Sequence, residues 1–221
     1  MTAHDAIKSI DFFKDLDEEQ VAFLQEISSI RKFSADTIVY YEDDIDYSLQ
    51  FLVNGTIKIY KIDKYDNEIF LYYIYSNNMI SEFTSIDESS IYCFSNAEFT
   101  EDGLILSIDF KKFKKKFINT GILTHSFIKE ILNKTHQLQC ILNRELVYDA
   151  TAKVAFMLNN DLEMFNKLKR TKVAFMLHIQ PETLSRVLKK LSRSEIISIE
   201  GQKIKILKAD ELLGIFRGIG Q

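Results

Sequence analysis

Short runs of β-branched and aromatic residues alternate with polar turns between Thr37 and Ile108. Ile38/Tyr40, Ile57/Ile59 and Ile105/Ser107 lie in such runs, whose residue types strands favour. The turn-forming pairs are Asp43-Asp44, Asn54-Gly55, Asp66-Asn67, Asn77-Asn78, Asp87-Glu88 and Asp102-Gly103. Strands this short, with turn signals this frequent, predict an all-β sandwich or barrel.

Residues 5–31 and 109–149 are expected to be helical. In the first segment, the acidic stretch Leu16–Gln20 precedes an apolar stripe. In the second segment, three phenylalanines recur at helical spacing with five lysines between them. These residues are Phe110, Phe113, Phe117, Lys111, Lys112, Lys114, Lys115 and Lys116. We interpret the lysines as the solvated side of a helix rather than as a nucleic-acid patch.

A heptad pattern runs through the segment from Ile118 to Val147, which has no proline and one glycine. The positions that step alternately by four and three residues are Thr124, Ile128, Ile131, Thr135, Leu138, Leu142 and Glu145. A seam this narrow on a long helix is better buried against its own copy than left in water. We therefore expect a homodimer whose interface contains Ile128, Ile131, Thr135, Leu138 and Leu142. The alternative is one more helix packed on the barrel.

Two helical stripes meet at a polar break within residues 171–191, after a hinge where Asp149 is the expected N-cap. The expected inner faces are Val173, Ala174 and Leu177 on the first helix and Leu184, Val187, Leu188 and Leu191 on the second. Pro181 suits the first turn of the second helix. This layout predicts a helix-turn-helix, whose second helix enters the major groove of DNA. Residues 196–200 and 203–207 alternate around Gly201-Gln202, which predicts a hairpin wing.

The outward residues of the second helix have the chemistry to read base pairs. They are Glu182, Ser185, Arg186, Lys189 and Lys190. Arg186 can hold guanine O6 and N7 together, and Glu182, four positions earlier, can accept from a cytosine amino group and pair with Arg186. Thr183 belongs to the same DNA-binding set. The expected phosphate contacts are Lys189, Lys190, Arg170, Thr171, Lys203 and Lys205. The alternative is a helix pair with ordinary surface charges.

The net charge of −4 conceals a division of the chain. Residues 1–149 carry 15 Lys and Arg against 25 Asp and Glu, a balance of −10. Residues 150–221 carry 13 Lys and Arg against 7 Asp and Glu, a balance of +6. A basic module that also contains a docking element indicates binding to phosphates.

Composition excludes several classes of protein. The 46% hydrophobic and 27% charged content is typical of a soluble globular protein. No apolar run approaches the roughly 18 residues that a membrane span needs, and the acidic N-terminus is unlike a signal peptide. Cys93 and Cys140 alone cannot form a disulfide framework or a zinc finger. We therefore expect a cytoplasmic protein with no membrane partner.

Taken together, these features resemble the Crp–Fnr transcription regulators over about residues 10–210. Glu182, Ser185 and Arg186 match the Glu-x-x-Ser-Arg signature of the Fnr-like branch. The resemblance implies a palindromic site with TTGA-like half-sites, with Glu182 and Arg186 on the guanine–cytosine pair and Ser185 on a neighbouring thymine. It also implies double-stranded DNA and RNA polymerase as partners. His178 departs from the pattern because the turn usually has glycine, although histidine tolerates a left-handed backbone better than most residues.

The resemblance implies an α+β fold with three parts. Residues 1–117 would form a cyclic-nucleotide-binding-like β-barrel (a double-stranded β-helix or jelly roll) with flanking helices. Residues 118–148 would form the dimerisation helix, and residues 149–221 a winged helix-turn-helix. The effector is not evident from the sequence, nor is the choice between activator and repressor.

Known effectors of the family can be compared with the residues present. Cyclic-nucleotide members place glycine and arginine around the cyclic phosphate. Here Ser81 stands for the glycine, Glu82 is kept, and no Lys or Arg lies between Lys64 and Lys111, which argues against cAMP. An iron–sulfur cluster is excluded because it needs four thiolates. Haem is a candidate because related sensors of nitric oxide and carbon monoxide use His or Cys ligands, and the residues available are His125, His136 and Cys93, besides His4 and Cys140. A redox event in the barrel is the other candidate signal.

Two further readings compete with a sensor. A metal-dependent oxygenase built on the barrel needs a histidine cluster, and all four histidines lie outside residues 37–108, so we expect no enzyme. An interaction module that binds DNA without an effector, or that answers to another protein, stays open. The aromatic residues of the barrel either line an apolar pocket or form its core, and we favour the core. They are Phe70, Tyr72, Tyr73, Tyr75, Phe83, Tyr92 and Phe94.

Overall fold

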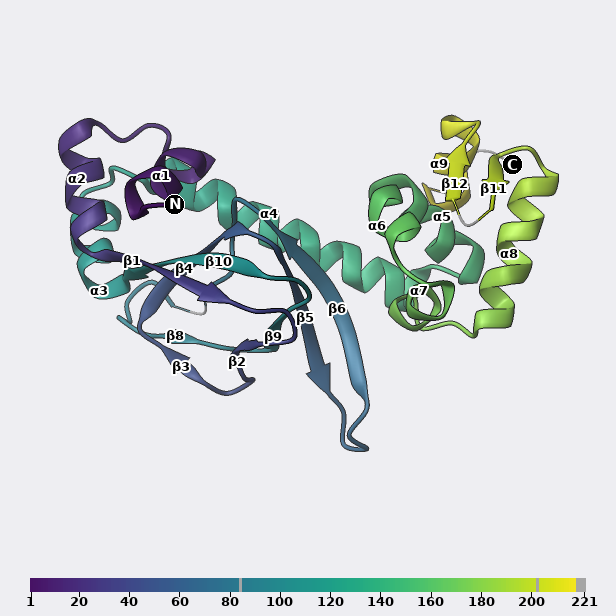
Figure 1. The fold of residues 1–221 in the computed structure, drawn as a ribbon, viewed down its shortest axis with the longest axis horizontal. Helices are drawn as coiled ribbons and strands as arrows, with labels where there is room; N and C mark the ends of the chain where they lie inside the picture. The colour runs from purple at the N-terminus through teal and green to yellow at the C-terminus, as the bar shows by residue number, and fades with distance from the viewer. Residues whose placement is uncertain (84, 202, 218–221) are drawn as a thin grey trace. The chain divides into compact units, whose positions relative to one another are not determined.

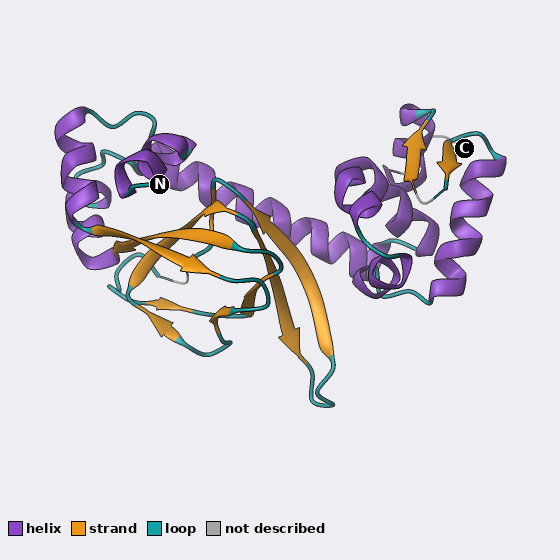
Figure 2. Cartoon of the chain, viewed as in Figure 1, coloured by secondary structure: helices purple, strands orange, loops and turns teal. Residues whose placement is uncertain are grey.

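A computed structural model describes residues 1–83, 85–201 and 203–217 (Figures 1 and 2). The chain forms two compact units, Met1–Gln137 and Leu138–Gln221. The first contains β sheets with flanking helices, and the second is a small, mostly helical domain with one hairpin. The α+β fold predicted from the sequence is confirmed, whereas the domain boundaries at 117 and 148 stay predictions.

Three short helices precede the sheets, where a helix over residues 5–31 was expected. They are α1 (Ala3–Ser9), the 3-10 helix η1 (Asp11–Phe13) and α2 (Glu18–Glu26). Asp17 caps α2 by accepting from the Gln20 backbone N–H at 2.8 Å, so this helix begins anew rather than continuing. The prediction is also wrong for residues 28–31, which belong to strand β1 (Ser28–Phe33) because they pair with a distant strand.

Among its described residues, the first unit contains two four-stranded sheets and one short pair of strands. One sheet has the order β1, β10 (Gly103–Asp109), β4 (Ser48–Asn54) and β7 (Asn78–Met79). The other has the order β2 (Ile38–Tyr40), β9 (Asn96–Phe99), β5 (Thr56–Ile62) and β6 (Glu68–Tyr75). Strand β3 (Ile45–Asp46) pairs with β8 (Ile91–Tyr92). All strand pairings among the described residues of this unit are antiparallel.

The predicted turns are where the backbone requires them. Asp43, Asp66 and Asn77 all have positive φ, and Gly55 has φ +101°. Asn and Asp tolerate this left-handed conformation because their short polar side chains bond locally, and glycine has no Cβ to clash.

The expected aromatic core is confirmed only in part. Phe70 and Tyr73 are buried, whereas Tyr75, Tyr92 and Phe94 are exposed, so the core prediction is wrong for these three. Tyr75 ends an edge strand beside a turn, and Tyr92 and Phe94 contact each other edge to face, with ring centroids 4.8 Å apart.

The helices after the sheets are interrupted where one continuous helical segment was expected. Helix α3 (Phe110–Phe113) continues into the π-helix η2 (Lys114–Ile118), and Phe110, Phe113 and Phe117 are buried as predicted. Gly121 then adopts φ +82°, which stops the helix, and the long helix α4 (Thr124–Leu142) begins after it. Helix α4 runs on into the π-helix η3 (Asn143–Val147).

After the end of α4 and the π-helix η3, the second unit contains five further helices and a hairpin among its described residues. The helices are α5 (Ala150–Asn160), α6 (Leu162–Lys167), α7 (Arg170–Met176), α8 (Pro181–Arg193) and α9 (Ala209–Arg217). Asp149 caps α5 as predicted, accepting from the Ala152 backbone N–H at 2.8 Å. The hairpin consists of β11 (Ile197–Glu200) and β12 (Lys203–Ile206), with Glu200 opposite Lys203. Of the predicted turn, Gly201 has φ +62°, and Gln202 lies outside the described residues.

Candidate nucleic-acid interface

Helices α7 and α8 pack through the apolar faces that the sequence predicts. Val173, Ala174 and Leu177 are buried on the α7 side, as are all four predicted positions of α8: Leu184, Val187, Leu188 and Leu191. Pro181 is the first residue of α8, where its missing N–H costs nothing. The interior of the helix pair therefore fixes which side of α8 faces outward.

His178 forms the turn between these helices in a left-handed conformation, with φ +52°. Its ring Nδ1 lies 2.8 Å from Glu145 Oε2. The sequence identified the unusual turn residue but not this contact, because Glu145 lies 33 positions away.

The outward face of α8 forms a basic surface on the second unit. Glu182, Ser185, Arg186, Lys189 and Lys190 are exposed, as predicted, and Thr183 is half-buried. These five exposed residues line a shallow surface hollow together with Arg193 and Ser194. Arg193 was not singled out from the sequence, although it lies seven positions after Arg186 and so returns to the same helical face. Four cations and one carboxylate therefore line this hollow.

The expected ion pair between Arg186 and Glu182 within α8 is replaced by a hydrogen bond from Arg186 to Thr183. Arg186 Nη2 donates to Thr183 Oγ1 at 3.2 Å, and no pair with Glu182 is present among the described contacts. Residues three and four positions earlier are both within reach on a helix, and here the guanidinium takes the nearer hydroxyl. The carboxylate of Glu182 therefore remains open to a partner outside the chain.

The predicted phosphate-contact residues differ in how they are held. Thr171 and Lys203 are exposed. Lys205 pairs with Glu200 at 2.8 Å across the hairpin. The Arg170 guanidinium lies 4.6 Å from the centre of the Phe165 ring and donates to the Phe165 carbonyl at 3.3 Å, and burial lowers its pKa. Arg170 thus also supports its own domain.

A charged cluster joins the end of the long helix to the helix-turn-helix. Glu145 Oε1 accepts from Arg144 Nε at 2.6 Å, and Glu145 Oε2 lies 3.6 Å from Lys153 Nζ, besides its contact with His178. Burial raises the pKa of Glu145, but hydrogen bonds from His178 and Arg144, with their charges, hold it below its ordinary value.

The predicted dimer seam is exposed in the single chain. Ile128, Ile131, Leu138 and Leu142 are 52%, 43%, 59% and 56% exposed, and Thr135 is also exposed. Branched apolar side chains in a row along one helix are costly to leave in water. The alternative of a helix that packs this stripe on its own barrel is therefore not what the structure contains.

Glu82 is held inside the barrel domain by donors of the chain itself. Its carboxylate accepts from the Phe94 backbone N–H at 2.9 Å, from Ser95 Oγ at 3.1 Å and from Tyr72 OH at 3.4 Å. A carboxylate that already uses these donors does not fit an anionic phosphate at the same place. The residues present therefore do not match a cyclic-nucleotide site.

Lys134 is a cation near this carboxylate that the sequence did not identify. Its Nζ donates to the Met79 carbonyl at 3.0 Å. Burial lowers the pKa of Lys134, and the charges of Glu130 and Glu82 act in the opposite direction. The lysine comes from α4, which is why a search confined to the barrel strands could not find it.

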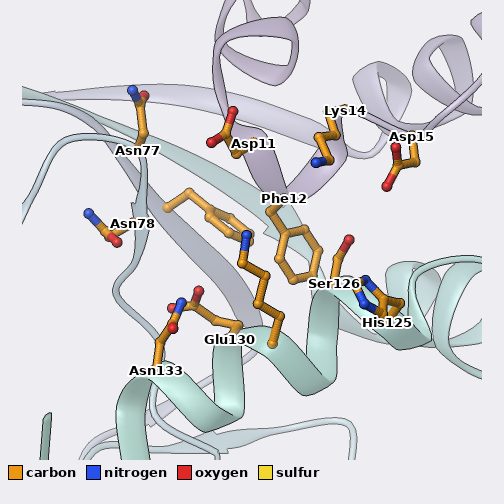
Figure 3. A pocket seen from close by; sticks show the side chains of 12 residues that line it. Asp11, Phe12, Lys14, Asp15, Asn77, Asn78, His125, Ser126, Glu130 and Asn133 are labelled. Atoms are coloured by element: carbon orange, nitrogen blue, oxygen red, sulfur yellow. The ribbon is translucent and has the colours of Figure 1, made fainter. Parts of the chain in front are cut away.

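The three haem candidates have surroundings that do not suit an iron ligand. His125 lies with Ser126 at the edge of a pocket of about 190 Å³ whose lining is mostly charged and polar (Figure 3). Ligand pockets usually hold about 300 Å³ or more and are mainly apolar. Cys93 is buried, and burial, together with Asp46, Glu82 and Asp44, raises its pKa to about 12, so it is a neutral thiol. His136 is exposed on α4.

Residues 1–83, 85–201 and 203–217 lack two further kinds of feature. No helix among them is both long and apolar enough to cross a bilayer. They also contain no group of three or more His, Cys, Asp or Glu side chains arranged to hold a metal ion.

Known proteins place this geometry in context. Residues 154–215 match the family model of the Crp-like helix-turn-helix domain. No curated protein matches the chain. FixK2 of Bradyrhizobium japonicum is 18% identical, with a TM-score of 0.65 over 86% of this chain and 97% of that one. A double mutant of CooA from Carboxydothermus hydrogenoformans is 17% identical, with a TM-score of 0.72 over 90% and 92%. CprK complexed with OCPA is 20% identical, with a TM-score of 0.64 over 87% and 93%.

At these identities the structural likeness concerns the fold, and the family match covers the segment that contains α7, α8 and the wing. The resemblance predicted from the sequence is thereby confirmed: this chain has the fold of the Crp–Fnr transcription regulators and carries a Crp-like helix-turn-helix domain.

Proposed function

We propose that this chain is a homodimeric regulator of transcription that reads a TTGA-like palindrome in double-stranded DNA. The observation that carries the proposal is the outward face of α8, where Ser185, Arg186, Lys189 and Lys190 lie exposed around Glu182. A helix that is anchored on one side and basic on the other is suited to enter the major groove.

The base-reading roles follow from the side chains near the start of α8. Arg186 has the forked donors that hold guanine O6 and N7. Glu182, which makes no pair with Arg186 in the described chain, is free to accept from the amino group of the paired cytosine. Ser185 is short enough to allow close approach and is assigned to a neighbouring thymine, as in the Fnr-like branch.

Sequence-independent contacts with the DNA backbone are proposed around these base-reading residues. Lys189, Lys190, Thr171 and Lys203 are exposed and are proposed to bind phosphates, and Arg193 extends the same face. Arg170 is proposed to contribute as well, although contact with DNA would compete with its stacking on Phe165.

Dimerisation through α4 would supply the second half-site. A twofold pair of helices presents two recognition helices to a palindrome, and RNA polymerase is the proposed further partner. The role is non-enzymatic in this proposal.

The effector of the barrel domain is proposed not to be an anion. Glu82 and its donors support this, because an anion would displace a satisfied carboxylate. Tyr40 OH and Gln50 Oε1 are buried with no hydrogen-bond partner among the described residues, so polar capacity for a neutral ligand remains inside the barrel. The second candidate is a regulator that needs no effector or answers to a protein, and the internal satisfaction of Glu82 favours it.

The test is a titration of purified protein with TTGA-type palindromic and scrambled duplexes at one stated salt concentration. Wild type is expected to prefer the palindrome. Arg186→Ala should lose about 1–3 kcal/mol on the palindrome and relax discrimination at the guanine, whereas Lys190→Ala should weaken both duplexes equally. Equal loss on both duplexes for Arg186→Ala would refute the base-reading role.

The same titration separates the two candidates for control. Tight, specific binding by the protein alone would support effector-independent or protein-controlled action. Weak binding by the protein alone that sharpens when a neutral ligand or haem is added would support a small-molecule sensor, and an absorption spectrum would distinguish the haem.

A further inference from the structure

A single carboxylate, that of Glu145, joins three elements of the second unit. Glu145 belongs to η3, which continues the long helix. Its Oε1 accepts from Arg144 of the same element, and its Oε2 lies 2.8 Å from His178 Nδ1 and 3.6 Å from Lys153 Nζ of α5. Glu145 therefore contacts the turn that precedes the recognition helix directly.

The environment of the cluster makes the contact effective. The side chains of Glu145 and His178 are 29% and 26% exposed, and those of Arg144 and Lys153 are 11% exposed. Half-buried charges are screened less than surface pairs, and a hydrogen bond that involves a charged group is stronger than a neutral one. Three cationic or protonatable groups share one carboxylate, so substitution of Glu145 removes three contacts at once.

His178 occupies a position that its side chain makes harder to form. A residue with a Cβ at φ +52° is disfavoured, whereas glycine adopts this conformation freely. The ring compensates by its contact with Glu145. Because His178 lies three residues before Pro181, the first residue of α8, this contact fixes the start of the recognition helix relative to η3.

We propose that Glu145 and His178 are positioning residues that set the angle of the recognition helix to the end of the long helix, and thereby the half-site spacing that the dimer accepts. The inference rests on the proposed function. In a dimer joined through the long helices, a change of this angle in each subunit alters the distance between the two recognition helices. Reading of a single half-site does not depend on that angle.

The test compares variants on duplexes that differ only in half-site spacing. The duplexes are a TTGA-type palindrome, the same palindrome with one base pair added or removed at its centre, a single half-site and a scrambled sequence. The variants are Glu145→Gln, His178→Gly, the double variant and His178→Asn. Glycine keeps the left-handed turn and removes the ring, whereas asparagine tolerates the turn and retains a donor.

Loss of the link should reduce the preference for the best spacing by roughly five- to tenfold, as expected for one partly screened, charge-assisted hydrogen bond. Glu145→Gln and His178→Gly should each show this loss, and the double variant should show no more. His178→Asn should retain part of the preference, and affinity for the single half-site should stay within about twofold of wild type. His178→Gly also relieves backbone strain, so unfolding does not explain the loss.

Glu211→Gln is the matched control, since it removes a carboxylate that pairs with Lys208 at 3.1 Å elsewhere in the same unit. It should leave the spacing preference unchanged. An unaltered preference in Glu145→Gln and His178→Gly, or an equal loss on every duplex, would overturn the positioning role while the proposed function stands. Failure of wild type to distinguish the palindrome from the scrambled sequence would instead refute the proposed function, and the inference with it.

Discussion

Cys93 is a buried thiol whose surroundings determine its chemistry. Its backbone N–H donates to the Asp44 carbonyl at 2.9 Å, and Asp46, Glu82 and Asp44 add negative charge around its sulfur. Burial and these charges raise its pKa to about 12. Because the thiolate is the reactive form, Cys93 should be inert in the folded protein.

A thiol-reactive dye at pH 8 should therefore label only Cys140, which is half-exposed on α4, and should do so slowly because burial raises its pKa too. Cys140→Ser should abolish labelling of the native protein, and Cys93→Ala should leave it unchanged. The measurement is the absorbance of the released dye with time. Prompt labelling of native Cys140→Ser would contradict the assignment and reopen a redox role for Cys93.

The same shift predicts how stability depends on pH. The folded thiol has a pKa of about 12 against an ordinary value of 9.0, so its contribution is complete below about pH 9 and is lost as the pH rises toward 12. The free energy of unfolding should therefore fall above pH 9, and less steeply for Cys93→Ala. Denaturant titrations at pH 8, 9 and 9.8 measure this, and because tyrosines, with an ordinary pKa of 10.0, contribute alike to both proteins, the difference between wild type and Cys93→Ala isolates the thiol. Parallel slopes for both proteins would refute the prediction.

At this scale, the sequence predicted burial better than it predicted contacts. The buried and exposed positions of α8 follow from a 3.6-residue period, which a single sequence displays. The contact of Glu145 with His178 depends on how the chain returns after 33 residues, which no local pattern encodes. The choice of Arg186 for Thr183 rather than Glu182 depends on a rotamer, and both partners lie at allowed helical spacings.

At the scale of helices and strands, the predictions are correct where the sequence pattern is local. They are wrong where pairing with a distant segment decides the structure. Ser28–Phe33 is a strand because its backbone pairs with the antiparallel strand β10, although the residues before it carry a helical apolar stripe. Gly121 was noticed as the one glycine of a long segment, but only its φ of +82° shows that α4 begins after it. The wing was predicted correctly because its alternation and its turn are adjacent in sequence.

The wing nevertheless depends on a residue outside it. Asn166 of α6 accepts from the Ile204 backbone N–H at 2.8 Å and donates to the Ile204 carbonyl at 2.9 Å, so one amide replaces a missing strand neighbour of β12. Ile204 is buried, and a buried backbone group without a partner is costly. Asn166 therefore anchors the wing to the helices.

Asn166→Ala should remove both the donor and the acceptor, at a cost of about 1–3 kcal/mol in the free energy of unfolding. Hydrogen exchange of the Ile204 amide, which loses its acceptor, should accelerate more than that of amides in α8. Asn160→Ala, at an exposed position of α5, is the control and should change neither quantity. Unchanged exchange at Ile204 in Asn166→Ala would show that Asn166 does not hold the wing.

At the scale of the whole molecule, the basic surface and the exposed apolar surface belong to different parts of the chain. The excess of cations in residues 150–221 coincides with the domain that carries the helix-turn-helix, and the acidic excess belongs to the rest of the chain. Helix α4 carries a row of exposed branched residues, Ile128, Ile131, Leu138 and Leu142, which no part of the described chain covers. Such a row is explained if a second copy covers it.

Ile131→Glu tests this directly. Ile131 is 43% exposed and lies within the row, so in a twofold dimer the substitution would bury two like charges near each other. The cost of about 3 kcal/mol or more corresponds to at least a hundredfold weaker association. Sedimentation across a range of protein concentrations should show a monomer, and affinity for the palindrome should fall toward that for one half-site.

Asn133→Glu adds the same charge at an exposed position of α4 outside the row, and it should remain a dimer. The comparison separates loss of the interface from a general effect of charge on the helix. If Ile131→Glu sediments as wild type does, the row is not the contact between subunits. The two recognition helices would then have to be brought to a palindrome by some other surface, and the angle set by Glu145 and His178 would no longer control the half-site spacing.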